Sequence, residues 1–194
     1  MREIGYDKEL HILLASPVKE LESLRGPLLN NSMNMMLHAN QSQTLVFGGA
    51  DSADCELLFA LPETAVSIVI GAMGPPSDPG ILLSLDVNAR AGSGNPRTIS
   101  ISGKLPGLYS GYQFALKPAE DTIYVRMLMD VVVAEIFVGA TEVGGGRAVV
   151  STLVAGGVPA SAAAVAVRAT GPGVRLVRGT IWGMGAIPAG WGYR

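Results

Sequence analysis

The chain is poor in cysteine, in charged residues and in long apolar runs. Its 194 residues include a single cysteine, Cys55, which excludes an internal disulfide and with it the class of disulfide-stapled scaffolds. We expect this thiol to be a small buried apolar group. Charged residues make up 15% of the chain and apolar residues 48%, against the roughly 25% of charged residues in an average soluble domain. The apolar runs fall far short of the roughly 20 residues of a membrane-spanning helix, so we expect no membrane span.

Basic clusters and metal-ligand spacings are lacking as well. The formal net charge is -2 and the basic residues are scattered, so we expect no nucleic-acid partner. His11, His38 and Cys55 are far apart and follow no ligand spacing, so we expect no metal and no cofactor. The N-terminal segment lacks the basic-then-apolar order of a signal peptide. The localisation is therefore open between the cytosol and a secreted chain whose leader was removed.

Short strand-like runs, each ended by Gly, Pro, Asn or Asp, fill most of the chain. This regular spacing predicts an all-β fold, a two-sheet antiparallel β-sandwich of about twelve strands. In 98–102, alternation places Ile99 and Ile101 on one face. The runs lie at 34–39, 43–48, 54–61, 65–73, 80–87, 97–102, 111–116, 122–130, 132–138, 147–154, 162–169 and 173–184.

The N-terminal segment 1–30 differs from the rest. Residues 1–14 predict one or two short strands around a turn that wrap an edge of the sandwich. Residues 17–25 predict one short helix, because Ser16 is a good N-cap and Pro17 suits the first helical position. We expect 1–30 to pack on a sandwich formed by 31–194, as one structural domain overall.

The most apolar stretch is 122–154, which reads as a hairpin. Its first arm, 123–138, is almost free of charge and therefore belongs at the centre of a sheet with both faces covered. The second arm is 147–154. Between them Gly139 and Gly144 to Gly146 supply the positive φ angles that β-branched residues resist.

Three segments carry a family resemblance. REIGYDKELHILLASPVKELESLRG, DVVVAEIF followed by GGRAVVSTLV, and VRLVRGTIW stand in this order along the chain. They are similar to the segment that leaves the catalytic propeller, to a D-x-S-x-x-E-x-F hairpin with its GGR turn, and to the last strand of one family. The chain thus resembles the C-terminal β-sandwich domain of glycoside hydrolase family 32, the invertases, fructanases and fructosyltransferases. The matching motif residues are Asp130, Glu135, Phe137, Gly145, Gly146, Arg147 and Thr152, while Val132 stands where the family has Ser.

The catalytic motifs of that family are missing. Its members carry catalysis on a propeller with WMNDPNG-type, RDP and Glu-Cys motifs, and this chain has none of them; its Cys55-Glu56 is in the reverse order. No catalytic residue can be carried over. The family implied is a glycosidase acting on β-fructofuranosides, but we expect no enzyme activity from this chain alone.

Two sets of residues are candidates for a site. Asp130 and Glu135 could form the carboxylate pair of a retaining glycosidase, but five residues along one strand would place them on opposite faces. We therefore interpret them as structural. Lys104, Tyr109 and Tyr112 lie in or beside a glycine-rich loop, where the tyrosines could stack on a sugar ring; packing over a bend is the plainer interpretation.

The resulting hypothesis is a non-catalytic β-sandwich module that acts in binding or protein assembly. One alternative is a separated fragment of a sucrose or fructan hydrolase, which would be secreted or vacuolar if it follows the family; another is a lectin-like carbohydrate-binding domain. We expect a homo-oligomer or a complex with a partner protein, because charge is scarce. The apolar residues expected at that interface are Val18, Leu21, Leu24, Ile187, Trp191 and Tyr193. Asn30-Asn31-Ser32 and Asn40-Gln41-Ser42 also match N-glycosylation acceptors.

Overall fold

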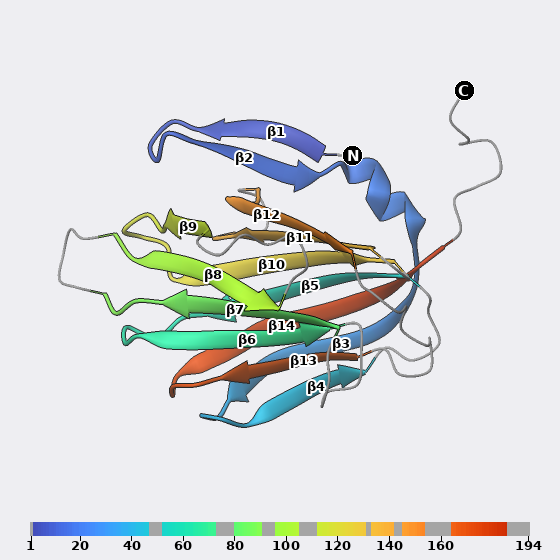
Figure 1. Ribbon diagram of the computed structural model, residues 1–194. Coiled ribbons are helices and arrows are strands. Elements are labelled where there is room, and N and C mark those ends of the chain that lie inside the picture. Colours follow the sequence, from blue (N-terminus) through green and yellow to red (C-terminus); the bar gives the residue numbers. More distant parts are fainter. Residues whose placement is uncertain are drawn as a thin grey trace.

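A computed structural model describes residues 2–46, 52–72, 80–90, 96–104, 112–130, 133–141, 145–153 and 164–185. Two six-stranded antiparallel sheets stack on each other, and a separate two-stranded hairpin lies beside the β12 side of the first sheet (Figure 1). The predicted two-sheet antiparallel β-sandwich is confirmed.

The order of the strands shows how distant segments meet. The first sheet runs β12 (Ala148–Leu153), β11 (Val133–Gly139), β10 (Thr122–Met129), β5 (Ala53–Ala60), β14 (Val174–Met184) and β3 (Arg25–Leu37). The second runs β4 (Ser42–Val46), β13 (Ala164–Ala169), β6 (Val66–Ala72), β7 (Ile81–Val87), β8 (Thr98–Lys104) and β9 (Tyr112–Ala115). The hairpin consists of β1 (Arg2–Asp7) and β2 (Ile12–Pro17), and the short helix η1 (Lys19–Leu24) connects it to β3.

The predicted strands match the observed ones within two residues at each end, with one exception. The run predicted at 34–39 is the end of a much longer strand, because β3 begins at Arg25. The asparagines before it, which look like a loop in the sequence, pair with β14, where Asn30 lies opposite Ile181 and Asn31 opposite Thr180. Backbone pairing with a neighbouring strand thus overrides their weak strand propensity.

A short helix lies where one was predicted at 17–25, but it is shorter than predicted. Ser16 and Pro17 end strand β2, and Val18 occupies the cap position with an extended backbone and no side-chain cap. Only Lys19–Leu24 is helical, as a 3-10 helix. A connection this short between two fixed strands has no room for a stable α-helix, whereas 3-10 turns are common connectors.

The hairpin predicted at 122–154 differs from the structure in its first arm, 123–138. This arm forms two antiparallel strands, β10 and β11, in which Tyr124 lies opposite Gly139 and Met129 opposite Ala134. The expected central position is confirmed, because β10 lies between β11 and β5 and is buried over most of its length.

The core is built from the alternate residues that the two sheets turn toward each other. The predicted shared face of Ile99 and Ile101 is confirmed, since both are buried, and so is the burial of Cys55. Other large core side chains are fully buried: Leu57, Phe59, Ile68, Ile70, Leu83 and Leu85.

Two leucines allow a matched test of this core. Leu57 is completely buried, whereas Leu28 on the edge strand β3 is 55% exposed. We expect Leu57→Ala to lower the free energy of unfolding by about 2–5 kcal/mol, since it leaves a cavity, and Leu28→Ala to lower it by less than about 1 kcal/mol. Urea denaturation followed by circular dichroism measures both, and equal losses would contradict this assignment of the core.

Candidate functional site

The β1–β2 hairpin is fixed to the sandwich through a glycine turn. The backbone N–H of Ala15 donates to the Gly146 carbonyl at 2.9 Å, and the N–H of Gly146 donates to the Ala15 carbonyl at 2.8 Å. This contact requires glycine: a Cβ at Gly146 would lie 2.9 Å from the Ala15 oxygen, and one at Gly139 would lie 2.4 Å from the Gly145 oxygen. Gly145 also has a positive φ of 72°. The glycines that carry the family resemblance therefore have an architectural role here.

Arg147 of the same motif fixes the other end of the hairpin. It donates to both carboxylate oxygens of Glu120, at 2.6 and 2.5 Å, and its guanidinium lies 3.8 Å from the Asp7 carboxylate. The Lys117 ammonium lies 2.9 Å from Asp7 and is the main reason why the pKa of Asp7 is lowered. The Lys117 side chain is 28% exposed and the Asp7 side chain 9%, so solvent screens their attraction only in part. These contacts hold the β1–β2 turn against the segment that follows β9.

Glu135 and Phe137 bind the start of the hairpin. The Arg2 guanidinium donates to Glu135 Oε1 at 2.6 Å and to the Ser151 hydroxyl at 2.5 Å. It also lies 6.0 Å from the centroid of the Phe137 ring, within reach of a cation–π contact. The interpretation of Glu135 as a structural carboxylate agrees with these contacts.

The parity argument that separated Asp130 from Glu135 is wrong in its premise. The two residues do not share a strand, because β10 ends at Met129 and β11 begins at Val133. Asp130 Oδ1 instead accepts a hydrogen bond from the Ser52 hydroxyl at 2.9 Å. Thr152, the last motif residue, is buried opposite Ala134. Val132 lies outside the described residues.

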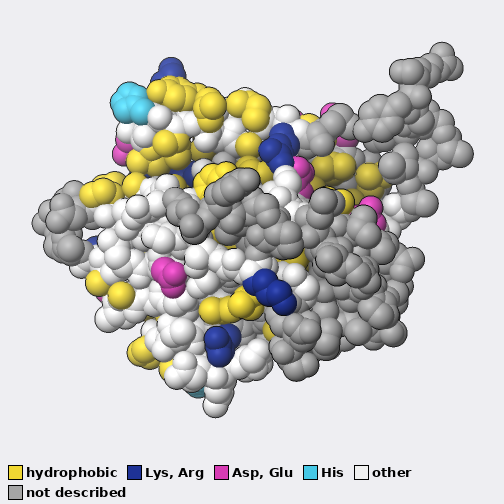
Figure 2. All heavy atoms as spheres, in the orientation of Figure 1, with side chains coloured by type: hydrophobic (Ala, Val, Ile, Leu, Met, Phe, Trp, Pro, Cys, Tyr) yellow, Lys and Arg dark blue, Asp and Glu magenta, His cyan; other side chains and the backbone are white. Residues whose placement is uncertain are grey.

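The outward face of the hairpin is apolar and exposed. Leu14 and Ser16 face Gly145, where a Cβ would lie 3.3 Å from the Leu14 Cβ atom and 2.7 Å from the Ser16 hydroxyl oxygen. Residues of the other parity therefore point away from the sandwich, except Arg2 at the end of β1, whose long side chain binds Glu135. Ile4 is 66% exposed, Tyr6 54% and Leu13 69%, and Tyr6 lies directly opposite Leu13. We call Ile4, Tyr6 and Leu13 the hairpin face; Figure 2 shows hydrophobic side chains gathered at the top of the molecule, over the hairpin.

This result changes where the apolar surface was expected. Val18, Leu21 and Leu24 are half-buried, and Ile187, Trp191 and Tyr193 lie outside the described residues. The sequence did contain a signal for the hairpin face, namely the alternation of Ile4 and Tyr6 with polar neighbours. Reading it required knowing which side of the hairpin meets the sandwich.

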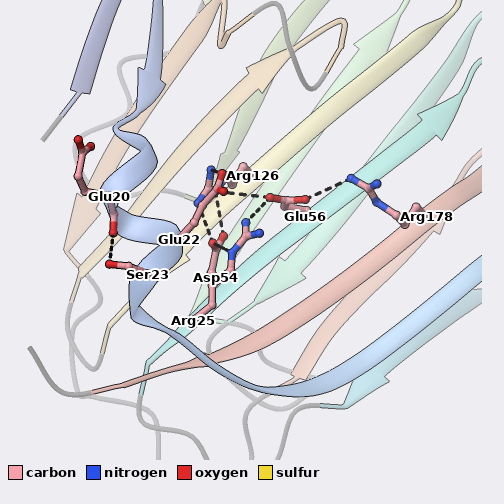
Figure 3. A network of polar contacts seen from close by, with 8 residues as sticks. All are labelled: Glu20, Glu22, Ser23, Arg25, Asp54, Glu56, Arg126 and Arg178. Carbon is pink, nitrogen blue, oxygen red and sulfur yellow. Dashed lines mark hydrogen bonds and ion pairs between the residues drawn. The ribbon is translucent and has the colours of Figure 1, made fainter.

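A buried ionic network crosses the outer side of the first sheet (Figure 3). Asp54 is fully buried and accepts two hydrogen bonds from Arg126, at 3.0 and 2.7 Å, and one from Arg25 at 2.7 Å. Glu56, two residues along β5, pairs with Arg25 and with Arg178. Glu22 of η1 lies 3.7 Å from Arg126. The network joins β3, β5, β10 and β14 and holds η1 over them.

Two aromatic residues border this network. The Arg25 guanidinium lies 3.8 Å from the centroid of the Trp182 ring. Trp182 is half-buried, because its parity places it on the outer side of β14, opposite Asp54. Burial, reinforced by the nearby Glu56 carboxylate, raises the pKa of Tyr124. Sequence reasoning missed this network, although the charged residues Asp54, Glu56 and Arg126 in otherwise apolar strands were a signal.

The residues predicted to bind sugar are not gathered on one face. Tyr112 lies on the edge strand β9, opposite the buried Ile101, and is 48% exposed. Lys104 ends β8, three residues beyond Ile101, so its side chain points to the other face of the sheet. Tyr109 lies outside the described residues.

Within the described ranges, no three His, Cys, Asp or Glu side chains are grouped so that they could hold a metal ion. None of the helices in the same ranges is long and apolar enough to cross a membrane.

Comparison with known proteins places the fold. Neither a protein-family model nor a curated protein sequence matches the chain. Among solved structures, fructan 1-exohydrolase IIa from Cichorium intybus matches with a TM-score of 0.69 and 16% identity, over 95% of this chain and 40% of that chain. Exo-inulinase from Aspergillus awamori matches with a TM-score of 0.61 and 14% identity, over 95% of this chain and 35% of that chain.

The chain has the fold of the C-terminal β-sandwich of glycoside hydrolase family 32. The predicted resemblance is thereby confirmed at the level of the fold. This β-sandwich spans well under half the length of the enzymes that it matches.

A double-mutant cycle tests the ionic network. We expect Asp54→Asn and Arg126→Met each to lower the free energy of unfolding by about 3 kcal/mol, because each leaves a buried charge short of a partner. The double variant should lose less than the sum of the two, by about 0.5–3 kcal/mol. Urea unfolding provides the values.

The control is Arg2→Met, which breaks the ion pair with Glu135 at a site where the Arg2 side chain is 37% exposed. This change should cost less than about 1 kcal/mol. Small and additive losses at Asp54 and Arg126 would show that the network does not stabilise the sheet.

Proposed function

We propose that the chain is a non-catalytic β-sandwich that acts through protein assembly, with the hairpin face as its contact. The observation that carries this proposal is the exposure of Ile4, Tyr6 and Leu13, each more than half open to solvent on an element whose other side is firmly anchored. A two-stranded hairpin is at best marginally stable alone. Its fixation at Asp7, Ala15 and Arg2 presents the apolar face in one orientation, as a binding surface requires.

Strand β1 adds an open edge to this surface. Within the described residues it pairs with β2 on one side only, so its other side offers backbone N–H and C=O groups to a further strand. The partner that we propose is a second copy of the chain, joined through antiparallel pairing of two β1 strands about a twofold axis.

The sequence of β1 suits self-pairing in one register. With Ile4 opposite Ile4 of the second copy, Arg2 faces Tyr6 and Glu3 faces Gly5, so no like charges lie directly opposite. A register shifted by two residues places Glu3 opposite Asp7, which is unfavourable. Because a stable interface covers about 800 Å² on each partner, the contact would extend beyond the hairpin face.

Sedimentation at micromolar concentration tests this proposal. The wild-type chain should sediment as a dimer, and Ile4→Ser with Tyr6→Ser should yield a monomer, because both side chains lie on β1 and face the second copy across the β1–β1 pair. Leu28→Ser, at an exposed leucine on β3, is the matched control and should remain dimeric. A wild-type chain that is monomeric throughout, with native circular dichroism, would overturn self-assembly.

The share of the enzyme chain that this chain matches favours a second candidate function. The chain matches 40% of the fructan exohydrolase, which is the share expected of a separated part of a larger hydrolase. In that case the hairpin face would meet the catalytic part of such an enzyme, and the activity would belong to the assembled protein. A monomer in the sedimentation test would leave this candidate as the better supported one.

Carbohydrate binding has a separate test. Tyr112 offers an aromatic ring, 48% exposed, beside the segment that contains Tyr109. A glycan array should show binding to a saccharide that is weakened about tenfold or more by Tyr109→Ala with Tyr112→Ala, since an aromatic contact contributes on the order of 1 kcal/mol per ring. Lys104→Ala, on the other face of the sheet, should leave the binding unchanged. Absence of binding on the array would remove the sugar site.

A further inference from the structure

The chain contains two Asn-x-Ser acceptor triplets, and the structure makes them unequal. Asn30-Asn31-Ser32 lies inside the long strand β3, and Asn40-Gln41-Ser42 lies where the chain passes from β3 to β4. N-glycosylation adds a bulky polar group, which a folded protein accommodates on an exposed loop and not inside a paired strand.

Asn30 is a poor acceptor. It is half-buried and lies opposite Ile181 in the β3–β14 ladder. Its side-chain oxygen accepts a hydrogen bond from the Ser32 hydroxyl at 2.9 Å, so the first and last residues of the triplet bind each other. A glycan on the Asn30 amide nitrogen would have to fit at a half-buried place where β3 packs beside β14.

Asn40 has the opposite properties. It is exposed, as are Gln41 and Ser42, and its positive φ of 61° is a turn conformation that asparagine tolerates well. The backbone of the turn is fixed, because the N–H of Asn40 donates to the Ala169 carbonyl at 2.8 Å and that of Gln41 donates to the His38 carbonyl at 3.0 Å. Within the described part of the chain no hydrogen bond holds the Asn40 side-chain amide, so it projects freely from a rigid base.

The turn that carries Asn40 lies beside exposed strand edges and apolar side chains that a glycan could cover. Strands β3 and β4 are edge strands of the two sheets, and the turn joins them on one side of the sandwich. On β3, Met33 is 57% exposed and Met36 is 46% exposed, so this side combines open strand edges with apolar side chains. Native proteins commonly shield such edges.

We propose that Asn40, and not Asn30, is an N-glycosylation acceptor of this protein. The glycan would stand over the edges of β3 and β4. This side lies at the bottom of the molecule in Figure 1 and the β1–β2 hairpin at the top, so modification is compatible with use of the hairpin face.

The reaction needs a lipid-diphosphate-linked oligosaccharide and an oligosaccharyltransferase. The Asn40 amide nitrogen forms a bond to C1 of the first sugar, and the bond between C1 and the diphosphate oxygen breaks. The lipid diphosphate leaves with the electron pair, while the amide proton passes to a base of the transferase. No oxidation or reduction takes place.

Translation of the full chain behind a cleavable secretory leader, with microsomes, tests the proposal. Only the protease-protected fraction is mapped, after deglycosylation by peptide-N-glycosidase in ¹⁸O water, which converts a modified Asn into labelled Asp. The label is expected at position 40. It should be lost in Asn40→Gln and in Ser42→Ala, and kept in Ser42→Thr, which retains the hydroxyl group.

Asn30→Gln is the matched control and should leave the label at position 40 unchanged. A protected chain with unmodified Asn40 would overturn the proposal, and so would labelling at position 30 alone. Labelling at both positions would support Asn40 as an acceptor but overturn the exclusion of Asn30.

Discussion

The arrangement of the first sheet depends on one fully buried carboxylate. Asp54 lies on β5 and is bound from two sides, by Arg126 of β10 and by Arg25 at the start of β3. A shift of β5 by one residue would turn Asp54 and Glu56 into the apolar core and bring Cys55 out, so both carboxylates would lose their arginine partners. Because an unpaired buried charge costs several kcal/mol, the ion pairs specify the register more than they add to stability. The start of β3, and with it η1 and the hairpin, takes its place from this contact.

The residues that suggest the hydrolase family receive a physical explanation that involves no catalysis. Gly145 and Gly146 allow the close backbone approach of β2, while Arg147 holds Glu120 beside Asp7. Glu135 and Phe137 receive Arg2. These five residues join the N-terminal hairpin to the sandwich, whereas Asp130 binds Ser52 and Thr152 is buried opposite Ala134. Most of the motif thus describes an attachment site within the fold.

The sequence predicted most strands because their signals are local: alternation such as that around Ile99 and Ile101, bounded by glycine and proline. The sequence-based prediction failed where the structure of a segment depends on a partner far away in the sequence. The asparagines of β3 become a strand through β14, and Asp54 meets Arg126 across a separation of 72 residues. The candidate site likewise has one part that local sequence signals predict and one part that depends on distant contacts. The motif residues were recognised, but the hairpin face became visible only once the sandwich showed which side of the hairpin it covers.

The position of the single thiol makes Cys55 a natural probe for opening of the first sheet. Cys55 is fully buried, and burial raises its pKa well above the usual value, so the reactive thiolate hardly forms in the folded protein. A reagent reaches it only when β5 separates from its neighbours at the centre of the first sheet. The rate of Cys55 alkylation therefore depends on global opening of the sandwich and not on fraying of its edges. It measures kinetic stability without any added label.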